Sequence, residues 1–167
     1  TCGTTSLYPT YFGTSRFSAK TYYGGNYDDY NTYFLFSAGG MDFVIIFLQY
    51  WPPTTPQMDW ADGILKAYPN RRGIVVSHAI LNIDDSWLYQ TIHTELRDNP
   101  NLFLMLCGHM HSATDGEALR SETYNGNTVH VLLSDYQDYP NGGNGWLRIL
   151  EFDPSVDHIN VTAYSPY

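Results

Sequence analysis

Short apolar runs and helical patterns alternate along the middle of the chain. The run at 42–49 (DFVIIFLQ) has the length and character of a strand that is buried on both faces. The runs at 73–78 (GIVVSH) and 102–107 (LFLMLC) are similar. Between these runs, apolar residues recur at helical spacing over about 55–68 and about 84–99. The order strand, helix, strand, helix, strand predicts parallel β-α-β units.

The pattern changes after residue 112. Apolar residues then gather in four short segments joined by turns that contain Asn-Gly or Gly-Gly, which is typical of antiparallel hairpins. We therefore expect an α/β fold with a mixed β-sheet, in which parallel β-α-β units are followed by antiparallel strands. The four expected strands are 118–123, 128–134, 145–152 and 159–164.

Residues 1–40 show no sustained hydrophobic period and are rich in Tyr, Gly, Ser, Thr and Asn. Turn residues interrupt the stretch YYGGNYDDYN at 22–31, which indicates an ordered loop or a short hairpin. We therefore divide the chain into a loop-rich N-terminal segment, 1–40, and a main unit, 41–167.

The composition narrows the possible partners. A chain of 167 residues with 43% hydrophobic residues can bury the core of one globular domain. The formal net charge of −9, with Lys20 and Lys66 as the two lysines, argues against nucleic-acid binding. No apolar run approaches the length of about 18 residues that a membrane span needs. Abundant Tyr, Asn, Thr and Gly with scarce Lys favours a secreted protein, extracellular or periplasmic. Cys107 is interpreted as a core residue, and whether Cys2 is paired or free stays open.

Two of the three apolar runs end in histidine. His78 closes the run at 73–78, and His109 and His111 follow the run at 102–107 across Gly108. Ligands of open α/β sheets bind beyond the carboxyl ends of the strands, where neighbouring strands lie about 5 Å apart. In an extended segment, residues two apart point the same way, so we expect the three imidazoles to converge. The sequence favours a metal site over the alternative of unrelated polar residues at loops.

The other histidines and motifs offer weaker sites. We expect His93 on the solvated side of its helix, His130 in a structural role and His158 in a turn. The stretch NGGNG at 141–145 resembles a phosphate-binding loop but is interpreted as a hairpin turn. The sequence contains no G-x-S-x-G, no glycine-rich phosphate loop and no H-E-x-x-H.

The segment VVSHAIL at 75–81, followed about thirty residues later by LCGHMHS at 106–112, resembles the C-terminal half of calcineurin-like metallophosphoesterases. In that family a lone histidine after a strand precedes a Gly-His-x-His motif. The likeness covers roughly 34–165 and implies half of a sandwich of two sheets. It implies a dinuclear site for Mn, Fe or Zn that hydrolyses phosphate esters. By the same resemblance His78 and His109 would bind one ion and His111 the other.

The family's N-terminal motifs do not occur in this chain. They are Asp-x-His, Gly-Asp-x-x-Asp and Gly-Asn-His-Asp/Glu, and they supply the remaining ligands of the family site. We therefore expect no catalytic residue in this chain and very poor hydrolysis by the chain alone. The missing N-terminal half is expected in cis or from another chain, or the chain covers its exposed sheet by self-association.

Residues near the mouth of the expected site are candidates for contacts with a phosphate-ester substrate. They are Asp135, Tyr136 and Gln137, and ordinary polarity at a strand end is the alternative interpretation. Asp135 and Asp138 also raise a glycosidase hypothesis, for which there is no second indicator. The alternative function is a non-catalytic structural or binding protein that self-assembles through an exposed sheet and a surface rich in its fifteen tyrosines.

Overall fold

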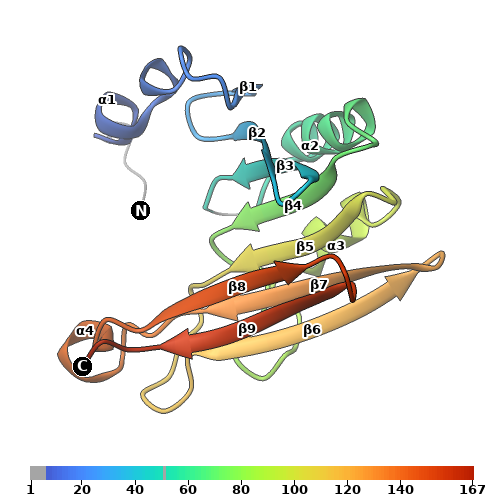
Figure 1. Cartoon of the computed structure of the whole chain (residues 1–167). Helices are drawn as coiled ribbons and strands as arrows, with labels where there is room; N and C mark the ends of the chain where they lie inside the picture. Colours follow the sequence, from blue (N-terminus) through green and yellow to red (C-terminus); the bar gives the residue numbers. More distant parts are fainter. Residues whose placement is uncertain (1–6, 51) are drawn as a thin grey trace.

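The computed structural model describes residues 7–50 and 52–167. In this part of the chain a mixed sheet holds seven strands in the order β1-β2-β3-β4-β5-β7-β6, and β8 pairs with β9 in a separate hairpin (Figure 1). The fold is α/β with a mixed sheet, as predicted. The strands are β1 (Tyr23–Asn26), β2 (Thr32–Ala38), β3 (Met41–Leu48), β4 (Arg72–Ser77), β5 (Leu102–Cys107), β6 (Glu117–Tyr124), β7 (Asn127–Ser134), β8 (Leu147–Asp153) and β9 (His158–Tyr164).

The strands β3, β4, β5 and β7 run parallel to one another, and β1, β2 and β6 are antiparallel to their neighbours. The parallel β-α-β units and the antiparallel β6–β7 and β8–β9 pairs were both predicted. The helical segments are α1 (Tyr8–Phe12), the 3-10 helix η1 (Thr14–Arg16), α2 (Thr55–Ala67), α3 (Gln90–Leu96) and the short turn α4 (Pro140–Gly143).

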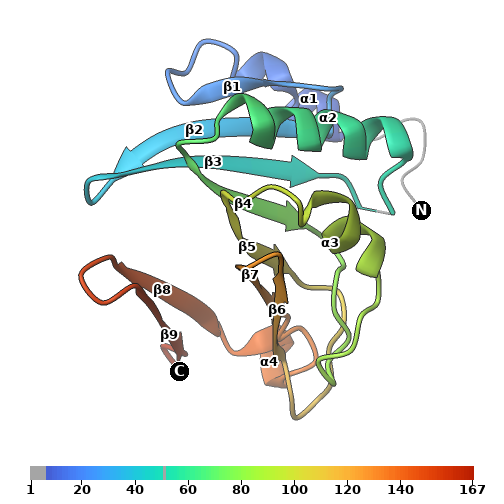
Figure 2. The same cartoon turned by 90° about the vertical axis from the view of Figure 1, so that its right-hand side faces the viewer.

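The larger core lies between the sheet and the helices α2 and α3. Ile46, Val75 and Met105 of the sheet pack with Leu65 of α2 and Leu96 of α3, and all five are fully buried. Figure 2 shows both helices on the same side of the sheet. Burial of each large side chain stabilises the fold by about 1.5–3 kcal/mol, so this layer holds the parallel strands in register.

The smaller core lies on the opposite face of the sheet, where the β8–β9 hairpin packs (Figure 2). Phe43, Ile74 and Leu104 of the sheet are buried there, and Phe152 and Ile159 of the hairpin pack against them. The helices and the hairpin therefore cover opposite faces of one sheet.

The sequence offers Thr55 as the N-cap of the first helix, with Pro56 in its first turn, but helix α2 already includes Thr55. Thr54 is the N-cap and forms a capping box with Gln57. Helix α3 is shorter than expected, and Leu88 lies outside it because the preceding loop folds back on itself. An isolated bridge joins Leu81 to Trp87, so the chain enters the helix only at Gln90.

The N-terminal segment is more ordered than the sequence indicated. The β1–β2 hairpin is one of the two interpretations of 22–31, and residues 32–38, within the segment expected to be rich in loops, form strand β2. Strand β2 pairs with β3 from Thr32 opposite Phe47 to Ala38 opposite Met41, so the division at residue 40 falls within a hairpin. Cys2 lies outside the described residues.

The stretch at 141–145 is not a hairpin turn, contrary to the prediction. It joins β7 of the main sheet to β8 of the separate hairpin, and these strands do not pair with each other. All five of its residues have positive φ, from 46° at Asn144 to 110° at Gly143, which glycine and asparagine tolerate best. The chain therefore changes layers through a left-handed turn.

In the described part of the chain, we find no helix with the length and apolar character that crossing a membrane requires.

Candidate metal centre

The parallel strands end at one edge of the sheet, and each is followed by a polar side chain that could contact a ligand. Tyr50 follows β3, His78 follows β4, His109 follows β5 and Asp135 follows β7. This edge is where open α/β sheets bind ligands. The sequence predicted the positions of the two histidines and of Asp135, but not that of Tyr50.

His78 and His109, hereafter the histidine pair, lie in direct contact. The Nε2 atom of His78 is 3.0 Å from Nδ1 of His109, and the ring centroids are 4.8 Å apart. The backbone N–H of Gly108 donates to the carbonyl of His78 over 3.0 Å and fixes the two strand ends together. Two imidazole nitrogens on one tetrahedral Zn²⁺ ion are about 3.3–3.4 Å apart, so small ring rotations would fit this pair to a cation.

The backbone at His109 adopts a strained conformation. Its φ is +70°, and the N–H of Met110 donates to the carbonyl of Gly108 over 2.9 Å, which together define a γ-turn centred on His109. Such a residue costs about 1–3 kcal/mol and persists only where its surroundings hold it. The expectation that His109 and His111 share an extended segment is wrong, because this turn interrupts it.

His111 has a partner of its own. Its Nδ1 lies 2.7 Å from Oδ2 of Asp138, and both side chains are partly exposed. A carboxylate on one ring nitrogen orients the imidazole and leaves Nε2 for a ligand, as at many metal-binding histidines. From the sequence, Asp138 was a candidate only as half of a carboxylate pair with Asp135, and its contact with His111 was not predicted.

Among residues 7–50 and 52–167, no three His, Cys, Asp or Glu side chains lie close enough together to hold one ion. The expected meeting of all three imidazoles is therefore not found there. The structure instead brings His78 to His109 and joins His111 to Asp138. The histidine pair supplies two nitrogen donors, which suit Zn, Mn or Fe.

The surroundings of His78 favour the uncharged form of its imidazole. Partial desolvation lowers the pKa of His78 from its ordinary value, the charge of His109 lowers it further, and Asp135 opposes both effects. The neutral imidazole, which is the form that binds metals, is therefore favoured at neutral pH.

The three candidate substrate contacts have different surroundings. Asp135 is half-buried, and its Oδ1 accepts a hydrogen bond from the backbone N–H of the exposed Gln137 over 3.1 Å. Tyr136 instead donates from its hydroxyl to Oε1 of Glu117 over 2.5 Å. Burial and this hydrogen bond raise the pKa of the Tyr136 hydroxyl. Asp135 and Gln137 remain candidate substrate contacts, while the hydroxyl of Tyr136 is already engaged.

His93 is not solvated, contrary to the prediction. Its side chain is 3% exposed and stacks on Trp87, with ring centroids 5.0 Å apart. Neither ring nitrogen has a hydrogen-bond partner among the described residues. Trp87 lies before the helix and covers a position that the helical pattern alone left open to solvent.

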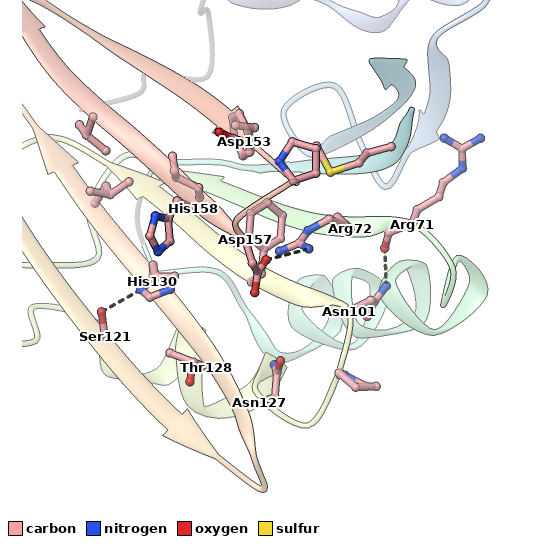
Figure 3. Close-up of a pocket in the computed structure, with 18 of the residues that line it drawn as sticks. Arg71, Arg72, Asn101, Ser121, Asn127, Thr128, His130, Asp153, Asp157 and His158 are labelled. Carbon is pink, nitrogen blue, oxygen red and sulfur yellow. Dashed lines mark hydrogen bonds and ion pairs between the residues drawn. The ribbon is translucent and has the colours of Figure 1, made fainter. Parts of the chain in front are cut away.

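A cavity of about 920 Å³ opens between part of the β8–β9 hairpin and the main sheet, and Arg72 at the start of β4 lies on its wall (Figure 3). The histidine pair instead follows the carboxyl ends of β4 and β5. The Arg72 guanidinium lies 4.1 Å from the ring centroid of Phe103 and 3.9 Å from Asp157. The Nδ1 atom of His130 is 2.8 Å from Oγ of Ser121. His130 thus has the structural contact expected of it, but its ring borders open space between two layers.

Comparison with known proteins finds a relative without an assigned function. The chain is 36% identical over 172 residues to "Uncharacterized protein YvnB" of Bacillus subtilis (strain 168), and the match covers 99% of this chain. The chain spans 13% of the length of that relative. No protein-family model matches the chain.

Proposed function

We propose that this chain forms the C-terminal half of a calcineurin-like metallophosphoesterase domain, and that its parent protein hydrolyses phosphate esters. The observation that carries the proposal is the 3.0 Å contact between His78 and His109 at neighbouring parallel strand ends. Ligand sites of this fold class lie at that edge, and paired imidazoles there suit a divalent cation.

The residues divide into two groups of donors. The histidine pair would hold one ion, and His111, oriented by Asp138, would hold a second, with Mn, Fe or Zn as the candidates. Divalent ions at such a site polarise phosphoryl oxygens. Asp135 and Gln137 lie at the same edge and would contact the alcohol portion of the ester. We assign no catalytic acid or base to this chain.

The exposed surface of the β8–β9 hairpin supports the proposal that this chain is part of a larger domain. A two-stranded hairpin is marginally stable alone, and among the described residues β8 and β9 pair solely with each other. Their outer face exposes Leu147, Ile149 and Tyr164 by 46%, 52% and 52%. We propose that the N-terminal half, in cis or from another chain, covers this hairpin and enters the cavity beneath it.

The composition favours a secreted parent protein, and we propose an extracellular or periplasmic location for it. The −9 net charge also favours a small phosphate ester over nucleic acid as the substrate.

The proposed activity is tested on the parent protein, purified with Mn²⁺ or Zn²⁺ and assayed with p-nitrophenyl phosphate. We expect turnover that falls by at least about a hundredfold in His109→Ala and persists in Glu95→Ala, an exposed residue of α3. The present chain alone should show very poor turnover. Equal rates for the two variants, or robust turnover by this chain alone, would refute the proposal.

A second candidate function is a non-catalytic assembly protein. The exposed apolar residues of the hairpin and the tyrosine-rich surface favour it, because unpaired strand edges and aromatic surfaces promote association. In that case the parent protein would form ordered assemblies, and mutation of the histidines would leave both assembly and function unchanged.

A further inference from the structure

Tyr50 stands over the histidine pair. Its ring centroid is 4.3 Å from that of His78 and 5.5 Å from that of His109, with interplanar angles of 79° and 57°. The side chain is half-buried. Tyr50 follows β3, the strand beside β4, so three consecutive strand ends contribute one ring each to this cluster.

The geometry of these contacts is that of favourable aromatic packing. At 79°, the edge of one ring meets the face of the other, which is the arrangement that the charge distribution of aromatic rings prefers. The contact with Tyr50 therefore holds the His78 ring in place.

Among the described residues, the two imidazoles of the histidine pair have little else that restricts their rotation. His78 lies just beyond β4 and is exposed, and His109 sits in the strained γ-turn. A ring that can swing freely loses rotational freedom when it binds an ion, whereas a ring that is already packed loses less. Packing against a third, half-buried ring limits the movement of both imidazoles.

We propose that Tyr50 is a positioning residue, which holds the imidazoles of His78 and His109 in the orientation that binds a divalent cation. This inference rests on the proposed metal site. Tyr50 acts through the two histidines and is not itself a ligand. Outer groups that orient metal ligands typically change metal affinity by about 10- to 100-fold.

The test is a titration of this chain with Co²⁺, in which binding is monitored through the visible absorption of the bound ion. The variants are Tyr50→Ala, Tyr50→Phe and, as a matched control, Tyr22→Ala. Tyr22 packs on Phe34, with ring centroids 5.3 Å apart, among the N-terminal strands. We expect Tyr50→Ala to weaken binding by about 10-fold or more and to alter the absorption bands, which report ligand geometry. Tyr50→Phe and Tyr22→Ala should bind within about threefold of the wild type, because Phe keeps the ring.

The outcomes separate this inference from the function on which it rests. Co²⁺ binding that is unchanged in Tyr50→Ala but lost in His109→Ala overturns the role of Tyr50 and leaves the metal site intact. Equal losses in Tyr50→Phe and Tyr50→Ala also overturn it, since the ring would then not be the supporting group. A wild-type chain that binds no Co²⁺ overturns both the inference and the proposed site.

Discussion

Asp138 places its Oδ2 atom 2.7 Å from Nδ1 of His111, although the two residues are 27 positions apart in the chain. His111 follows β5 and Asp138 follows β7, and these strands are parallel neighbours. The sheet therefore places the carboxylate of Asp138 beside Nδ1 of His111, at the edge where the histidine pair lies. A ring held in this way presents its other nitrogen outward, which is the orientation that a metal ligand needs.

Replacement of Asp138 by asparagine should lower phosphoesterase activity of the parent protein by about 10- to 100-fold. The amide can still form a hydrogen bond but no longer offers a negative charge to the imidazole of His111. The assay is the rate of p-nitrophenyl phosphate hydrolysis at saturating Mn²⁺. The control is Asp59→Asn, an exposed carboxylate on α2. A rate for Asp138→Asn that matches the control would show that the contact does not serve the site.

His93 should make the stability of the fold depend on pH. Desolvation lowers its pKa below the ordinary value of 6.5, with Arg97 and Arg120 lowering it further and Glu122 opposing them. As the pH falls through about 6.5, the unfolded chain binds a proton before the folded chain does, so the free energy of unfolding decreases. The decrease should end below the folded-state pKa, where both states are protonated.

His93→Phe should reduce this loss, and the part that remains includes the contribution of His78, whose pKa is also lowered. The substitution should also raise the free energy of unfolding at pH 8 by about 1 kcal/mol, because two unpaired buried nitrogens are replaced by an apolar ring. Urea unfolding at pH 5 and pH 8 measures both effects. Thr94→Phe adds the same ring at an exposed position of α3 and should retain the pH dependence. If His93→Phe loses as much stability between pH 8 and pH 5 as the wild type, His93 is not the source.

Arg148 should anchor the β8–β9 hairpin to the sheet. Its Nη2 lies 2.7 Å from Oε2 of Glu117, its Nη1 donates to the carbonyl of Leu133 over 3.1 Å, and its side chain is 13% exposed. Arg148→Met should destabilise the fold by about 2 kcal/mol, less than the loss on breaking a fully buried pair.

The measurement for Arg148→Met is the urea midpoint, with amide hydrogen exchange of β8 and β9 as a local readout. Lys66→Met breaks an exposed pair with Asp62 on α2 and should change the midpoint little. Unchanged exchange in the hairpin of Arg148→Met would mean that apolar contacts alone hold it.

The outer face of the hairpin should cause this chain to self-associate when the rest of its domain is absent. Ile149 is 52% exposed at the centre of that face, and its burial between two copies would be lost in Ile149→Lys. We expect association to weaken by about tenfold or more, measured by light scattering across a concentration series. Glu151→Lys is a matched control, because it adds a lysine without removing an apolar contact. If Ile149→Lys and the wild type associate equally, another surface is responsible.

The central strands could be predicted because both of their faces are buried, and this makes successive positions along each strand apolar. The run Phe43–Leu48 is apolar on both faces since one face meets the helices and the other meets the hairpin. Strand β2 was missed because its half-buried residues are fixed by pairing with β3, a contact that the local pattern of Tyr, Thr and Phe does not reveal.

The candidate site could be predicted only as far as it depends on strand ends. His78 and His109 end neighbouring parallel strands, and that position brought them together as expected. Tyr50 and Asp138 were missed because their contacts arise between segments that are distant in sequence. The γ-turn at His109 was missed because the glycine before it indicated a turn but not which residue would carry the positive φ.

The most direct measurement is an isothermal titration of this chain with Zn²⁺, comparing the wild type with His78→Ala, His109→Ala and the remote control His158→Ala. We predict that the wild type and His158→Ala bind an ion at the histidine pair with similar affinity, and that His78→Ala and His109→Ala each lose that ion. Equal binding by all four proteins, or no binding by the wild type, would contradict this prediction.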